Sequence, residues 1–80
     1  MQDPQELCEK AVECFKEDPG EAFRLFREAA EAGYPNGYFG LAEMKFNGYG
    51  VDKDVEGAAE LYKAAAEAGH PPSMYRLGLL

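Results

Sequence analysis

The fold is decided by a stretch that occurs twice in the chain. Residues 21–44 read EAFRLFREAAEAGYPNGYFGLAEM, and residues 57–80 read GAAELYKAAAEAGHPPSMYRLGLL. At this offset of 36 residues, nine of the 24 aligned positions are identical. The shared residues are small side chains, turn residues and one large apolar residue per helix, which is the set that closely stacked antiparallel helices require. We therefore interpret the chain as a helical repeat.

Proline and glycine residues divide the chain into five expected helices. The expected ranges are 4–17, 19–32, 35–46, a fourth helix that begins after Asp52 or Asp54 and ends at Ala68, and 73–80. No segment alternates apolar and polar residues for long enough to predict a strand. The fold class expected is all-α.

The first of these helices carries two adjacent apolar stripes at helical spacing, Leu7-Ala11-Cys14 and Cys8-Val12-Phe15. If its two cysteines share one helix, their Cα atoms are about 9 Å apart, which is too far for a disulfide. We expect both thiols to be buried as small apolar groups in a reducing compartment. The N-terminus has no basic region followed by an apolar run, so no signal peptide is expected and the location predicted is cytoplasmic.

The segment between the two copies adds a more specific pattern. Residues 37–69 carry Leu41, Gly48, Gly50, Val51, Asp54, Ala58, Ala65, Ala66 and Gly69 in one register. This pattern, and above all its G-x-G-V-x-x-D turn, resembles the Sel1-like repeat, which is related to the tetratricopeptide repeat. The chain departs from that repeat in having Gly37 where alanine is usual and Leu61 where tryptophan is usual.

The resemblance implies an α-α superhelix, a right-handed solenoid of antiparallel helix pairs, formed as a single domain over residues 1–80. Within it we expect a divergent N-terminal helix (1–20), the second helix of the first pair (21–33), a full repeat (34–69) and a partial repeat (70–80).

Residues suited to catalysis or metal binding are few. Ser73 is the only serine, His70 is the only histidine and there is no threonine. An S-x-x-K motif is absent because Arg76 stands three residues after Ser73. The two cysteines and one distant histidine lack the spacing of zinc ligands. We predict no enzymatic activity, no cofactor and no metal.

Charge restricts the class of partner. Fifteen acidic and eight basic residues give a formal net charge of -7. This charge argues against nucleic acid and anionic membranes, and it favours a basic or neutral ligand.

The resemblance also implies where a partner would bind. The concave face of such a solenoid is built mainly from the first helix of each pair. Carrying over the related geometry, that face would contain Asn36, Phe39, Glu43, Phe46 and Tyr75, with Pro72 and Leu79 beside them. The function expected is a protein-interaction module that binds a peptide or protein there. Phe39, Phe46 and Tyr75 could instead pack between repeats, and both interpretations remain open.

A second function is suggested by the apolar segment 75–80. It has no polar outer face, which a terminal helix of a solenoid needs. Either the chain continues as a longer array, or Leu77, Leu79 and Leu80 bury themselves against another molecule. The alternative function is therefore a structural repeat that forms a homo-oligomer through this segment.

Overall fold

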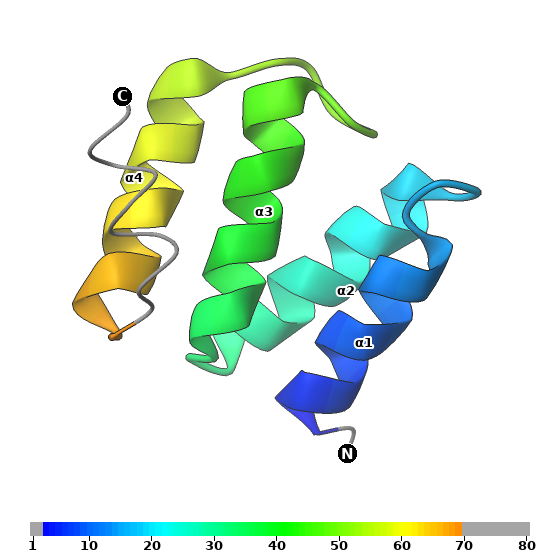
Figure 1. Ribbon diagram of the computed structural model, residues 1–80, viewed down its shortest axis with the longest axis horizontal. Helices are drawn as coiled ribbons and strands as arrows, with labels where there is room; N and C mark the ends of the chain where they lie inside the picture. Colours follow the sequence, from blue (N-terminus) through cyan, green and yellow to red (C-terminus); the bar gives the residue numbers. More distant parts are fainter. Residues whose placement is uncertain (1–2, 70–80) are drawn as a thin grey trace.

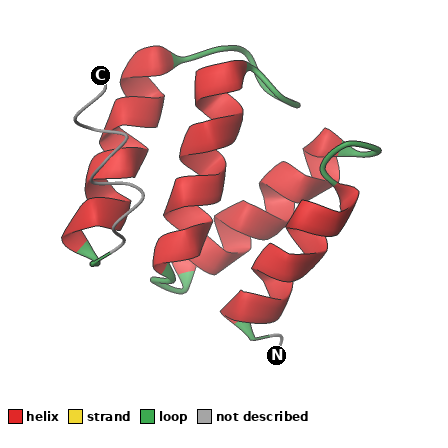
Figure 2. Ribbon diagram, in the orientation of Figure 1, coloured by secondary structure: helices red, strands yellow, loops and turns green. Residues whose placement is uncertain are grey.

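The computed structural model describes residues 3–69 of the chain, and this part contains four helices and no strand (Figures 1 and 2). The helices are α1 (Pro4–Cys14), α2 (Pro19–Glu31), α3 (Pro35–Asn47) and α4 (Val55–Glu67). The all-α fold class is confirmed. The fifth expected helix, 73–80, lies outside the described residues.

An aspartate caps the N-terminus of three of the four helices. The side chains of Asp3, Asp18 and Asp54 accept hydrogen bonds from the backbone N–H groups of Gln5, Glu21 and Gly57, at 3.0, 3.2 and 2.9 Å. Such bonds satisfy N–H groups that have no partner inside a helix. Asp54, rather than Asp52, is therefore the cap of α4.

The expectation that the first helix reaches residue 17 is wrong, because α1 ends at Cys14. A residue before proline is restricted to extended backbone, and Asp18 precedes Pro19 with φ -143° and ψ 78°. The chain must leave the helix before that point. The N–H of Asp18 donates to the carbonyl oxygen of Cys14 at 2.7 Å and closes the intervening turn.

The apolar face of α1 also differs from the expectation. Leu7, Cys8 and Ala11 are buried, but Cys14 is only half-buried and Val12 is 62% exposed. The cause is that α2 covers the side of α1 that carries Leu7 and Ala11. Val12 lies about 100° further round the helix and is not covered.

The repeated residues form the core. Ala22 and Ala29 of α2 and their counterparts Ala58 and Ala65 of α4 are all completely buried. One cluster joins α1, α2 and α3, and a second joins α3 and α4 through Ala42, Ala58 and Tyr62. Figure 1 shows α3 and α4 side by side, with α1 and α2 on the other side of α3. Helix α3 is thus shared by both clusters.

Helices α2 and α3 approach unusually closely at two glycines. A Cβ atom on Gly37 would lie 2.8 Å from the carbonyl carbon of Ala29 and 2.9 Å from the Cα of Ala30. A Cβ atom on Gly40 would overlap the ring of Phe26. These contacts explain why α3 contains two residues of low helix propensity.

The loop between α3 and α4 reaches back to α2 (Figure 1). Gly50, with φ 71°, lies against Pro19, and a Cβ atom on Gly50 would be 2.9 Å from the Pro19 carbonyl oxygen. Only glycine fits both the backbone angle and the contact. The loop thereby joins the second helix pair to the first residue of α2.

We predict that Gly37→Ala destabilises the protein by about 1–3 kcal/mol, because the new methyl group meets the backbone of α2. Gly20→Ala is the matched control, since its nearest neighbour would be an Asp18 oxygen at 3.7 Å and alanine favours the helix. The free energy of unfolding in urea measures both. A stable Gly37→Ala variant would show that the close approach does not hold α2 and α3 together.

We also predict that Asp54→Ala lowers the free energy of unfolding by about 1 kcal/mol, because it removes the cap of α4. Asp52→Ala, two residues earlier and not a cap, should change it by a few tenths of a kcal/mol, roughly the value of a charge near a helix end. Equal losses in urea titrations would refute the cap assignment.

Candidate functional site: a groove between α1 and α3

An open groove of about 820 Å³ lies between α1 and α3. Both helices pack on α2, and they contact each other over fewer residues than they contact α2. The floor is formed by three nearly buried side chains, Cys8, Phe26 and Met44, which are 7%, 8% and 3% exposed. Because Gly40 has no side chain, the ring of Phe26 lies directly against the backbone of α3.

Apolar side chains with much larger exposure line the groove around this floor. Val12 on α1 is 62% exposed, and Tyr49, just after α3, is 50% exposed. The rings of Phe15 and Tyr49 meet edge to face, with centroids 6.0 Å apart, at one end of the groove. Tyr34 lines the groove just before the start of α3, at the opposite end. The groove thus combines an apolar floor with aromatic ends.

The two walls are polar and acidic. Each contributes amide and carboxylate side chains, Gln5, Glu9 and Glu13 from α1 and Asn36, Glu43 and Asn47 from α3. The amide of Gln5 donates to the Glu9 carboxylate at 3.5 Å, and the amide of Asn47 donates to the Glu43 carbonyl oxygen at 2.9 Å. Among the described residues that line the groove there is no lysine or arginine.

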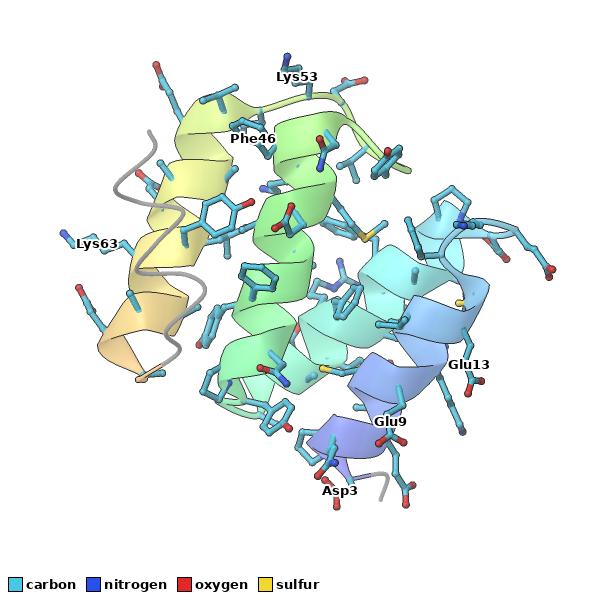
Figure 3. All side chains as sticks on the ribbon, in the orientation of Figure 1. Asp3, Glu9, Glu13, Phe46, Lys53 and Lys63 are labelled. Carbon is cyan, nitrogen blue, oxygen red and sulfur yellow. The ribbon has the colours of Figure 1, made fainter. Side chains whose placement is uncertain are left out.

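The structure brings three of the sequence-predicted site residues to this groove: Asn36, Phe39 and Glu43. Phe39 also packs against Tyr62 of α4, with ring centroids 5.8 Å apart, so it is half-buried between the two helices of one repeat as well. Phe46 does not line the groove. It packs against the Ala42, Ala58 and Tyr62 cluster, between α3 and α4 (Figure 3). Tyr75, Pro72, Leu77, Leu79 and Leu80 lie outside the described residues.

Sequence reasoning missed the contribution of α1 to the site. The sequence pattern places Val12 on the apolar face of the first helix and gives Gln5 and Glu9 no binding role, because that helix does not follow the repeat. One signal was present: Val12 falls four residues after Cys8, on a stripe displaced from the Leu7-Ala11 stripe. Two neighbouring stripes on one helix indicate two packing partners, of which α2 provides one.

Reactive chemistry in the groove is limited to one thiol. Burial raises the pKa of Cys8 from 9.0 to about 11, because the apolar surroundings disfavour the charged thiolate. Within residues 3–69 no group of three or more histidine, cysteine, aspartate or glutamate side chains is placed to hold a metal ion. None of the helices in this part of the chain has the length and apolar character needed to span a membrane.

Comparison with protein families identifies the repeat. The sequence profile of the Sel1 repeat matches residues 13–34, 35–70 and 71–80, which together extend from the end of α1 to the last residue. The chain belongs to the Sel1 repeat family. Sel1 repeats generally mediate protein–protein interactions, and the family is typically a non-catalytic scaffold. No match is found among curated proteins.

Only part of the groove is formed by residues that the Sel1 profile matches. The Sel1 match over 35–70 contains α3 and α4, and the match over 13–34 contains α2 but only the last two residues of α1. The α3 wall and the Phe26 floor therefore belong to Sel1 units. Most of the α1 wall lies before the matched range.

We predict that native Cys8 reacts slowly with iodoacetamide. At pH 8, a pKa of about 11 in place of 9.0 leaves roughly a hundredfold less thiolate. The measurement uses Cys14→Ser, so that Cys8 is the only thiol, and compares the alkylation rate with that in concentrated urea. Similar rates in the two conditions would contradict the burial of this thiol.

Proposed function

We propose that this Sel1 repeat protein is a non-catalytic interaction module that binds a segment of a partner protein in the groove between α1 and α3. The observation that carries the proposal is the exposure of Val12 on the α1 wall and of Tyr49 at the end of that groove, at 62% and 50%. Apolar side chains in a concave site are the usual source of binding energy for peptides and small ligands.

The energetic argument rests on what a partner would cover. Burying the exposed part of Val12 is worth roughly 1 kcal/mol, and the ring of Tyr49 offers more area in one rigid side chain. The floor beneath them is already packed, because Cys8, Phe26 and Met44 belong to the core cluster. A partner would therefore meet a surface that needs little ordering before it binds.

The polar walls support peptide binding in particular. The exposed amide of Asn36 can both donate and accept hydrogen bonds, as a peptide backbone requires. Phe39 lines the groove and also contacts Tyr62 of α4, so a partner in the groove would touch a side chain that belongs to the α3–α4 contact. Within this proposal Asn36, Phe39 and Glu43 keep the role predicted from the sequence, and Phe46 supports α3 from the side of α4.

Other parts of the predicted function are proposals of the same kind. The acidic walls disfavour the phosphates of nucleic acids and of anionic membranes. The two free thiols, Cys8 and Cys14, are typical of a reducing compartment and support a cytoplasmic location. Self-association through Leu77, Leu79 and Leu80 stays a prediction of the sequence.

The test begins with a phage-displayed random library of peptides of roughly twelve residues, selected on the full chain. For peptides that bind in the groove, Val12→Gln should weaken binding about tenfold, because it replaces an apolar contact by a polar side chain. Glutamine is at least as good a helix former as valine, so α1 should remain folded.

Val55→Gln is the matched control, since Val55 is also an exposed helical valine, at 44%, and does not line the groove. Isothermal titration calorimetry measures both variants. If every selected peptide binds Val12→Gln and Val55→Gln as it binds the parent chain, the groove is not the binding site.

A further inference from the structure

Two exposed carboxylates of α1, Glu9 and Glu13, line the groove, and no lysine or arginine lines it among the described residues. Glu43 is half-buried on α3 across the groove from them. Figure 3 shows Glu9 and Glu13 along α1. Carboxylates gathered around an apolar floor produce a negative potential that the low-dielectric surface beneath them strengthens.

The outer face of α2 is arranged differently. Arg24 is paired with both Glu21 and Glu28, and Arg27 with Glu31 at 3.7 Å, all on the same helix. Lys10 lies in a second, smaller hollow formed by α1 and α2, and Glu13 borders both this hollow and the groove. Within residues 3–69, the acidic groups of α2 are therefore paired with cations of the same helix, whereas Glu9 and Glu13 face a groove that no described lysine or arginine lines.

The dimensions and charge of the groove restrict its occupant. Helix α3, which forms one wall, has 13 residues and is roughly 20 Å long. That length matches about six residues of extended chain. A second copy of this protein would bring a formal charge of -7 toward acidic walls, so a copy is a poor occupant.

We infer that the occupant of the groove is a cationic segment of a partner protein, with lysine or arginine side chains beside one or two large apolar ones. The apolar side chains contact Val12, Phe39 and Tyr49, and the cationic ones lie along Glu9 and Glu13. This inference rests on the proposed function and adds the chemistry of the partner to it.

The experiment uses peptides selected as described above on the parent chain at low ionic strength. The result expected is enrichment of lysine and arginine over the starting library, next to aromatic or aliphatic residues. Glu9→Gln combined with Glu13→Gln should weaken binding of these peptides about three- to tenfold, the range for two exposed charge pairs. Raising sodium chloride to about 0.5 M should remove most of that difference, because salt screens exposed charges.

Glu60→Gln combined with Glu67→Gln is the matched control. It removes the same charge from exposed positions on α4 that do not line the groove, so any loss due to net charge alone appears in both double variants. Thermal unfolding of each variant shows whether α1 and α4 remain folded.

The outcomes separate the two proposals. Peptides that depend on Val12 but are neutral or acidic, or that bind both double variants equally, would overturn the inference and leave the groove as the binding site. A peptide set with no dependence on Val12 would overturn the proposed function and the inference together. Light scattering that shows a dimer disrupted by Val12→Gln would make a second copy the occupant and also overturn the inference.

Discussion

The close approach of α2 and α3 is the constraint on which the rest of the structure depends. Gly37 brings the backbone of α3 against Ala29 and Ala30, and Gly40 brings it against the ring of Phe26. Any side chain at these positions would push the two helices apart. Since α1 also packs on α2, the spacing of α2 and α3 determines how α1 and α3 face each other. The groove therefore depends on Gly37 and Gly40 in α3, which have no side chain, and on the ring of Phe26 in its floor.

Much of the fold could be predicted because its signals are local. Proline and aspartate mark the helix starts, glycine marks the ends, and the repeated alanines mark the buried faces. Each of these signals acts within one helical turn and needs no knowledge of the neighbouring helix. The predicted end of the first helix, residue 17, was wrong because two local signals disagree. The apolar pattern, which runs on to Phe15, favours a longer helix, whereas Pro19 restricts Asp18 to extended backbone.

The site was less predictable because it depends on which helix faces which. Phe39 and Phe46 are seven residues apart and occupy the same side of α3, so helical periodicity predicts the same environment for both side chains. In the structure both pack against the cluster of Ala42, Ala58 and Tyr62, but only Phe39 also lines the groove. The α1 wall could not be predicted from the sequence for a different reason. Helix α1 lies almost entirely before the matched Sel1 units, so the repeat supplies no register for Val12 or Glu9.

The recognition proposed for this chain uses other residues than the fold does, and the difference has a physical cause. The repeat holds its helices together through small residues and glycine, which allow close packing but offer a partner little area or charge. Large apolar and charged side chains are open to a partner where no second helix covers them, as at Val12, Tyr49 and Glu9. Those positions come from α1 and from the loop after α3. The Sel1 units therefore supply the α3 wall and the Phe26 floor, and in the proposed function recognition of a particular partner depends most on the helix that precedes them.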